Sequence, residues 1–140
     1  MPAPTFDAMM KARATRARST LHGLRVLVVE DESIVSFLLE DMLSELGCRV
    51  VGHASNVRQA LAMLAQLTPD AAVLDVNLRG EMAFPIADRL QSDAVPFLFA
   101  TGYGALGIPE RWRGCPVVQK PFRLSELASA LEAAVSARAG

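Results

Sequence analysis

Polar and charged side chains stand at the ends of short apolar runs in four separate parts of the sequence. Glu30 and Asp31 directly follow the run Val-Leu-Val-Val, and Asp75 follows a second aliphatic run. Thr101 and Lys120 stand at the ends of two further runs of this kind. Brought together, these side chains would form one small site that holds three carboxylates, one hydroxyl and one ammonium group.

Such a site has a definite chemical requirement. Three neighbouring carboxylates repel one another and raise each other's pKa unless a cation neutralises them. A hard divalent ion with oxygen ligands fits this requirement, so the acids predict Mg2+. Thr101 and Lys120 are suited to binding an anion beside that ion. The set as a whole suits phosphoryl transfer, in which charge neutralisation and positioning supply most of the catalysis.

The elements that must position these residues form a repeating pattern. From Arg25 onward, short apolar runs rich in β-branched residues alternate with longer amphipathic stretches, which predicts β-α units around a parallel sheet. Right-handed crossovers bring the carboxyl ends of all strands to one edge of such a sheet. The polar residues at the ends of the runs are therefore expected to converge. The predicted strands are residues 25–30, 48–54, 71–74, 95–100 and 115–119.

The predicted helices have recognisable ends. Ser33 is expected to cap the first helix, and Gly47 stands just past its end. Ser55 or Asn56 can cap a second helix, residues 57–67, which Pro69 stops. Residues 101–114 hold four glycines and a proline, which predicts a loop or a short, irregular helix. The remaining helices are residues 84–90 and 124–137, and the expected inward positions are Ile34, Leu38, Met42 and Leu46 in the first helix and Leu124, Leu127, Leu131 and Val135 in the last.

Length and composition predict one folded domain. The 140 residues are 51% hydrophobic with a formal net charge of -1, which suffices for one well-filled core. We expect a basic leader, residues 1–24, partly disordered or forming a short helix over Ala8 to Ser19, and a folded domain over residues 25–140. No apolar run approaches the ~20 residues that span a bilayer, and no signal peptide is recognised, so a cytoplasmic location without membrane contact is expected.

Four motifs carry a resemblance to a known family. They are EDE after the first predicted strand, LDVNLRGE around Asp75, FATGY around Thr101 and QKPF around Lys120. Together they resemble the receiver domain of two-component response regulators, which is CheY-like. The resemblance covers Arg25 to the C-terminus. It implies an α/β fold with a doubly wound, five-stranded parallel sheet of order 2-1-3-4-5, flavodoxin-like, here with a shortened or irregular fourth helix.

The resemblance also implies a role for the residues around the metal. Asp75 would be the phosphoacceptor, and Asp31 would bind Mg2+ directly. Glu30 would contact the ion through water. Asn77, two residues after the acceptor, would offer its backbone carbonyl to the metal.

Residues around the phosphoryl group follow the family pattern with one departure. Thr101 and Lys120 would each bind a phosphoryl oxygen, and the Lys120–Pro121 bond is expected to be cis. Receivers usually carry Tyr or Phe three residues before this lysine as a rotameric switch, whereas this chain has Val117. We hypothesise that Tyr103, or the TGYG segment around it, takes over the switching role.

The implied function is that of a stand-alone receiver. The run PFLFATGYG, residues 96–104, is similar to the FATGUY subgroup of single-domain receivers, which is associated with general stress signalling in alphaproteobacteria. A sensor histidine kinase or phosphotransferase would phosphorylate Asp75. Output would be altered contact with an unidentified downstream protein, without direct DNA binding. The domain would not be an enzyme, apart from catalysing its own phosphorylation and dephosphorylation.

Rival functions are weighed against particular residues. A phosphate sink that only drains a kinase would differ from a signalling receiver in the lifetime of phosphorylated Asp75. Haloacid-dehalogenase-like phosphohydrolases also use an aspartyl nucleophile, but they carry DxDx(T/V) after the first strand, where this chain reads EDES. A flavodoxin-type FMN carrier needs a phosphate loop there, and Glu30 to Glu32 would repel the phosphate.

Five other notable residues are open to a structural interpretation. Glu32 is expected to be a solvated acid in the first helical turn. His53 is expected to be a partly buried or edge residue, and Trp112 could either anchor a partner or fold over the shortened loop. Cys48 and Cys115 begin the predicted edge strands, so a bridge between them within one chain is excluded.

Overall fold

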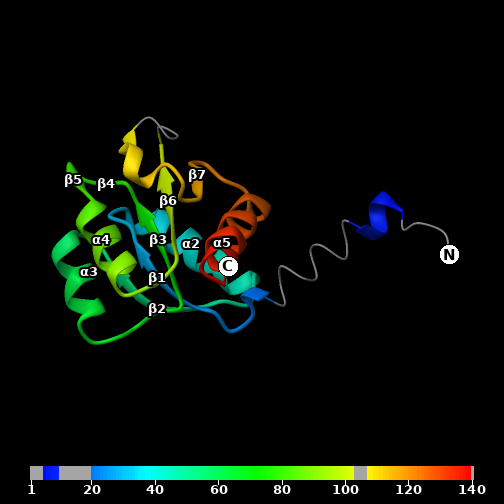
Figure 1. Ribbon diagram of the computed structural model, residues 1–140, viewed down its shortest axis with the longest axis horizontal. Helices are drawn as coiled ribbons and strands as arrows, with labels where there is room; N and C mark the ends of the chain where they lie inside the picture. The colour runs from blue at the N-terminus through cyan, green and yellow to red at the C-terminus, as the bar shows by residue number, and fades with distance from the viewer. Residues whose placement is uncertain (1–4, 10–19, 103–106, 140) are drawn as a thin grey trace.

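A parallel sheet forms the centre of the molecule. The computed structural model describes residues 5–9, 20–102 and 107–139. The sheet has five strands in the order β2-β1-β3-β6-β7, all parallel (Figure 1), which is the order 2-1-3-4-5 predicted for the main strands. The strands are β1 (Arg25–Val29), β2 (Arg49–Ala54), β3 (Ala71–Asp75), β6 (Phe97–Thr101) and β7 (Val117–Gln119). The predicted α/β fold is confirmed.

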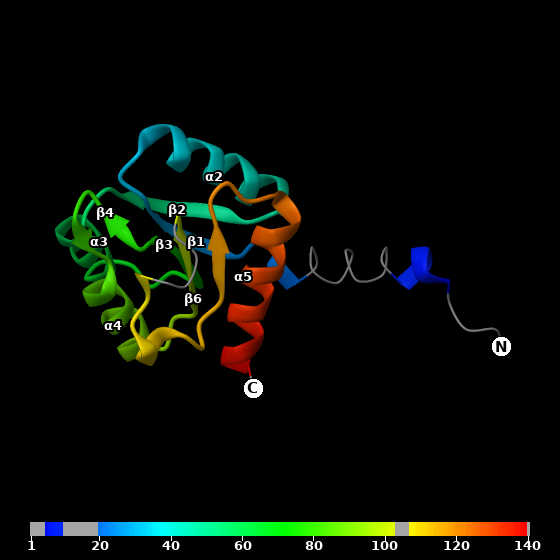
Figure 2. The same ribbon diagram turned by 90° about the horizontal axis from the view of Figure 1, so that it is seen from above.

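Helices cover both faces of this sheet. Helices α2 (Ser33–Glu45) and α5 (Leu124–Ala139) lie on one face, and α3 (Val57–Leu64) and α4 (Phe84–Ser92) lie on the other (Figures 1 and 2). Strand β1 shows why a doubly covered strand is apolar throughout. Val26 and Val28 pack among residues of α2 and α5, whereas Leu27 and Val29 pack among residues of α3 and α4. All four side chains are fully buried.

Helix α2 turns a stripe toward the sheet that agrees with the predicted one only in part. Leu39 and Leu43 are buried and the predicted Met42 and Leu46 also pack on the core, whereas Ile34 and Leu38 are 76% and 53% exposed. The helix is apolar around most of its circumference, so a four-residue period fits more than one stripe. The expectation that Ser33 caps the helix is also wrong, because the N-cap residue is Glu32 and no side chain caps this end.

The other helix boundaries agree more closely with the sequence. The side chain of Asn56, not Ser55, caps α3 by accepting a hydrogen bond from the Gln59 N–H at 2.8 Å. Helix α3 ends at Leu64, three residues earlier than expected. In α5, Leu127 and Leu131 are fully buried as predicted. Gly47 follows α2 with φ at 85°, and a Cβ there would stand 2.9 Å from the ring of His22, so this position requires glycine.

In the described part of the segment between β6 and β7, residues 107–116, no α-helix forms, as predicted. This part contains the 3-10 helix η2 (Glu110–Trp112). Trp112 is 3% exposed and packs edge-to-face against Phe97 and Phe99. Trp112 therefore fills the space over β6 that a longer helix would cover, and it is not an exposed anchor for a partner.

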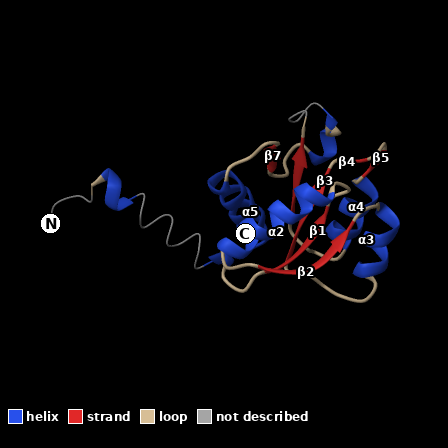
Figure 3. Cartoon of the chain, turned by 180° about the vertical axis from the view of Figure 1, so that it is seen from behind, coloured by secondary structure: helices blue, strands red, loops and turns tan. Residues whose placement is uncertain are grey.

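A residue before β1 also belongs to the core. Leu21 is fully buried among the residues of α2 and α5. The helix expected over Ala8 to Ser19 lies largely outside the described residues. Strands β2 and β7 lie at opposite edges of the sheet (Figure 3), so Cys48 and Cys115, which precede them, are free and far apart as expected. None of the described helices is long and apolar enough to cross a membrane.

Candidate functional site

The predicted site residues converge at the carboxyl edge of the sheet. Glu30 and Asp31 follow β1, Asp75 is the last residue of β3, and Thr101 is the last residue of β6. Lys120 directly follows β7, and its backbone N–H donates to the carbonyl of Thr101 at 2.8 Å. Parallel pairing thus places side chains from four strands side by side. The Lys120–Pro121 peptide bond is cis.

Three carboxylates form the floor of the site. One oxygen from each of Glu30, Asp31 and Asp75 lies within 4.8 Å of the others. Glu30 is 3% exposed and Asp75 is 7% exposed, which is rare for acids because burial removes them from water. Buried carboxylates persist only when a cation or hydrogen bonds compensate for the lost hydration.

Lys120 supplies part of that compensation. Its Nζ lies 2.8 Å from Oε2 of Glu30 and 3.3 Å from Oδ2 of Asp75. Burial alone would lower the pKa of Lys120, but the hydrogen bond to Glu30 and the charges of Asp75 and Glu30 outweigh burial and raise it. The ammonium group is therefore held in its charged form between two acids.

One ammonium does not fully offset the acids around it. Burial, followed by the charge of Glu30, raises the pKa of Asp75 from 3.8 to about 7, although Lys120 acts in the opposite direction. Asp75 therefore keeps its proton to a higher pH than a solvated aspartate does. A second cation would shift it to the ionised, nucleophilic form.

The donor set fits a divalent ion. Carboxylate oxygens and a backbone carbonyl are hard ligands of the kind that Mg2+ prefers, and the site opens to solvent so that waters can complete the coordination. The site lies in a cleft of about 660 Å³. We call it the carboxyl-edge cleft, and its lining includes Asp31, Asp75, Asn77, Arg79, Thr101 and Lys120.

A short hairpin forms one wall of the cleft. Strands β4 (Asn77–Leu78) and β5 (Glu81–Met82) pair antiparallel around Arg79 and Gly80. The backbone N–H of Asn77 donates to Oδ1 of Asp75 at 3.3 Å, which keeps the start of the hairpin against the acid.

Arg79 is a site residue that the sequence reasoning missed. Its Nε donates to Oδ2 of Asp31 at 3.2 Å. The sequence signal was Arg-Gly between two short extended pairs. The angle φ is 55° at Arg79 and 90° at Gly80, and type I′ hairpin turns need positive φ at both central positions.

The other residues considered in the sequence analysis are Thr101, Val117, Glu32 and Tyr103. Thr101 is 3% exposed at the end of β6. Val117 is half-buried in β7 and packs on the core under α3 and α4. Glu32 is exposed, as expected. Tyr103 lies outside the described residues.

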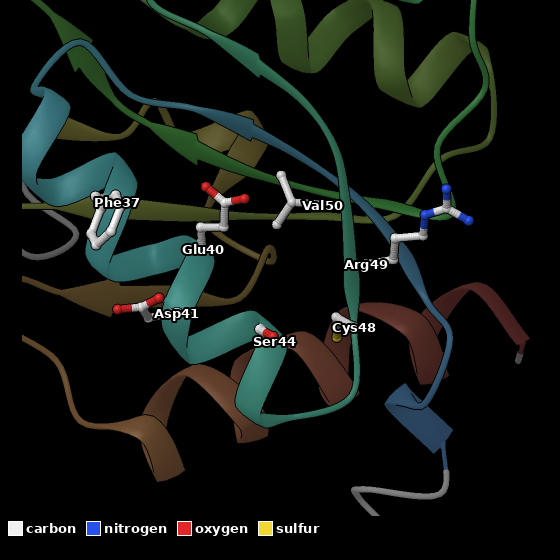
Figure 4. Close-up of a pocket in the computed structure, with 7 residues that line it drawn as sticks. All are labelled: Phe37, Glu40, Asp41, Ser44, Cys48, Arg49 and Val50. Carbon is white, nitrogen blue, oxygen red and sulfur yellow. The ribbon is translucent and has the colours of Figure 1, made fainter.

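A second polar region lies between α2 and the edge strand β2. This α2–β2 pocket has a volume of about 450 Å³ and is lined by Phe37, Glu40, Asp41, Ser44, Cys48, Arg49 and Val50 (Figure 4). Beside it, His53 Nδ1 lies 2.8 Å from Ser36 Oγ, and His53 Nε2 lies 3.1 Å from Glu40 Oε2. His53 is thus an edge residue, as expected.

The residues in and beside the α2–β2 pocket are less suited to catalysis than those of the carboxyl-edge cleft. Burial raises the pKa of Cys48 to about 11, so this thiol is not an activated nucleophile. The side chains of Glu40 and His53 are 48% and 41% exposed, so water already stabilises them. The carboxyl-edge cleft is the candidate functional site.

This chain is similar to several known proteins. The sequence model of the response regulator receiver domain family matches residues 26–132. Among curated relatives, the transcriptional regulatory protein PdtaR of Mycobacterium tuberculosis is 31% identical over 116 residues, which cover 80% of this chain and 57% of PdtaR. This chain spans about half the length of the curated relatives it matches first.

Three solved structures match this chain over nearly their whole length. SdrG from Sphingomonas melonis Fr1 is 42% identical with a TM-score of 0.74, covering 81% of this chain and 97% of SdrG. SdrG in its BeF3-activated conformation, there assigned to Pseudomonas melonis Fr1, is 43% identical with a TM-score of 0.71, covering 81% and 98%. The receiver domain of PhyR from Erythrobacter litoralis is 28% identical with a TM-score of 0.74, covering 84% and 93%.

Proposed function

Because this chain belongs to the response regulator receiver domain family, we propose that Asp75 accepts a phosphoryl group from a histidine kinase or phosphotransferase in a Mg2+-dependent reaction. One observation carries the proposal. A nearly buried carboxylate at the floor of an open cleft lies 3.3 Å from an ammonium group and beside two further acids. This arrangement suits charge neutralisation during phosphoryl transfer.

The acids and one carbonyl would hold the metal. Asp31 and Asp75 would bind it directly, Glu30 would act through water, and Asn77 would contribute its backbone carbonyl. When bound, Mg2+ supplies positive charge to the transferring phosphoryl oxygens. It would also take over part of the charge compensation that Lys120 gives to Asp75.

The transfer itself is an in-line exchange at phosphorus. A carboxylate oxygen of Asp75 forms the new P–O bond while the P–N bond to the donor histidine breaks. The bonding electron pair stays on the departing imidazole nitrogen, which then takes a proton. Lys120 donates a hydrogen bond to one phosphoryl oxygen, and the hydroxyl of Thr101 donates to another. Asp75 must be ionised to attack, so its raised pKa makes the reaction depend on a cation.

The donor protein would dock beside the cleft on α2. Ile34, Phe37 and Leu38 are 76%, 64% and 53% exposed, although all three are large and apolar. Phe37 also lines a cavity together with Glu30 and Asp31. Exposed apolar side chains gathered next to a reactive site favour a protein partner.

Phosphorylation would be transmitted through the ends of β6 and β7. Thr101 and Lys120 stand at these two ends, and the backbone bond between them couples their positions. Val117 cannot act as an aromatic rotameric switch, so we assign that role to Tyr103 or the TGYG segment. The output would be changed contact with a downstream protein, in a general stress response according to the FATGUY resemblance.

Acetyl phosphate provides the direct test. With Mg2+, intact mass should show one added phosphoryl group, and Asp75→Asn should show none. Phosphorylation of Asp75→Asn to the same extent would refute the assignment. The lifetime of the phosphorylated form then separates the two receiver roles, because a phosphate sink requires rapid hydrolysis and a signalling receiver requires persistence.

A further inference from the structure

Each of the three clustered acids, Glu30, Asp31 and Asp75, has a basic partner. Lys120 contacts Glu30 at 2.8 Å and Asp75 at 3.3 Å. No ion pair between Lys120 and Asp31 is found among the described residues. Asp31 is paired instead with Arg79, at 3.2 Å. The acid proposed as the direct metal ligand is thus the one that an arginine neutralises.

The fold holds Arg79 in this position from both sides. The side-chain oxygen of Asn77 accepts a hydrogen bond from the Gly80 N–H at 2.6 Å, which closes the hairpin turn. The carboxylate of Glu81 accepts from the Val57 N–H at 3.0 Å, which ties the hairpin to the start of α3. The guanidinium group is therefore presented to Asp31 by an anchored turn.

The backbone conformation at position 79 does not explain why an arginine stands there. At φ 55°, Arg79 is in the left-handed region, where glycine and asparagine are preferred. If the backbone conformation alone decided the residue type, glycine or asparagine would stand in this turn. The Arg79 side chain is 79% exposed and contributes little packing, so its contact with Asp31 is what distinguishes it from those residues.

We propose that Arg79 is a counter-ion that Mg2+ must displace from Asp31, so that it weakens the metal site and metal binding releases the Arg79 side chain from this acid. This inference rests on the proposed function, because it assumes the metal site there. A guanidinium group and a divalent cation cannot both lie against one carboxylate oxygen without strong repulsion. Since Arg79 is mostly exposed, it can swing into solvent when the ion binds.

Titration calorimetry with MgCl2 tests the proposal without a phosphodonor. Arg79→Asn removes the charge with a residue that tolerates the left-handed conformation, and it should bind Mg2+ about three- to tenfold more tightly. Arg79→Lys keeps the charge and should stay closer to the unaltered protein. Arg49→Ala is the matched control, because Arg49 is exposed and begins β2 at the opposite end of the sheet, and its affinity should not change.

A second measurement follows Arg79 itself. In 1H-15N spectra, the Nε–Hε signal that Arg79→Asn lacks should shift during the Mg2+ titration with the same midpoint as the calorimetry. Equal affinities in Arg79→Asn and the unaltered protein, or an Nε–Hε signal that Mg2+ leaves in place, would overturn the inference and leave the proposed function standing. If the unaltered protein takes up no Mg2+, the proposed metal site fails as well.

Discussion

The carboxyl-edge cleft and the α2–β2 pocket are both rich in acids, yet only one has the properties of a reactive site. In the cleft, side chains from four strands converge, and the Glu30 side chain is 1% exposed. In the pocket, the polar residues come from two neighbouring elements, and the Glu40 side chain is 48% exposed. A carboxylate that water already solvates costs little to keep, whereas a buried one must be compensated.

The contrast between these two regions indicates which structural feature marks the functional site. Both regions are hollows of several hundred Å³, and in each an acid of the lining is hydrogen-bonded to a basic residue. They differ in how deeply their acids are buried. Burial, followed by the charge of Glu30, raises the pKa of Asp75 to about 7. The four predictions below use this difference, beginning with the largest expected effect.

The pH dependence of stability should separate Asp75 from every acid of the pocket. The folded state holds the Asp75 proton more tightly than the unfolded chain does, so the metal-free protein should lose stability as pH rises from 3.8 to about 7. The loss should be on the order of several kcal/mol. Asp75→Asn should therefore be more stable than the unaltered protein above pH 7, and the gap should close at low pH. Urea unfolding across this pH range measures it.

Glu40→Gln is the matched control for that experiment. It removes an exposed carboxylate, and its stability should follow that of the unaltered protein at each pH. Mg2+ should also reduce the gap between Asp75→Asn and the unaltered protein. An Asp75→Asn variant that is less stable than the unaltered protein above pH 7 would contradict the assignment of Asp75 as a strained, buried acid.

Removal of the ammonium group should have the next largest effect. Lys120→Met keeps the length of the side chain but takes the positive charge away from Glu30 and Asp75. The rate of phosphorylation by acetyl phosphate should fall about 100-fold, because one group that stabilises the transferring charge is lost. A rate within about twofold of the unaltered protein would show that Lys120 only balances charge in the resting state.

The exposed apolar residues of α2 should matter only for a protein donor. Phe37→Ala should slow phosphotransfer from the kinase about tenfold, because a large side chain is lost from the docking surface. Its phosphorylation by acetyl phosphate should not change, since that donor needs no protein surface. Ser44→Ala, on the same helix and also in the α2–β2 pocket, is the control. Equal slowing with both donors would place Phe37 in the chemistry instead.

The smallest effects are expected at the hydrogen-bonded cluster beside the pocket. His53→Ala breaks the contacts with Ser36 and Glu40, but none of these three residues is buried. Stability should fall by less than about 1 kcal/mol, and the phosphorylation rate should stay the same. A large loss of phosphorylation in His53→Ala would abolish the distinction between the two regions.

The convergence of the site could be predicted from the sequence because it follows from a general rule. Short apolar runs that end in polar residues indicate parallel strands, and parallel strands share one carboxyl edge. That reasoning placed Glu30, Asp31, Asp75, Thr101 and Lys120 together without any knowledge of loops. The order of the main strands followed from the family resemblance.

Other features depend on contacts that no local pattern encodes. The stripe of α2 that faces the sheet could not be chosen, because Ile34 and Leu38 are as apolar as the buried Leu39 and Leu43. The pairing of Arg79 with Asp31 joins residues 48 positions apart through a two-residue turn. Trp112 is buried because its ring packs against those of Phe97 and Phe99. It stands in a glycine-rich segment, and that segment has no hydrophobic periodicity from which the contact could be predicted.

The most direct test of the central claim is to locate the site with BeF3, a mimic of the phosphoryl group. 1H-15N spectra would be recorded with Mg2+ alone and then with Mg2+ and BeF3. We predict that the largest additional shifts are at the backbone amides of Asp75, Thr101 and Lys120, and that Asp75→Asn abolishes them. Shifts centred on Glu40 and His53, or no response to BeF3 in the presence of Mg2+, would contradict the assignment of the carboxyl-edge cleft as the phosphoryl site.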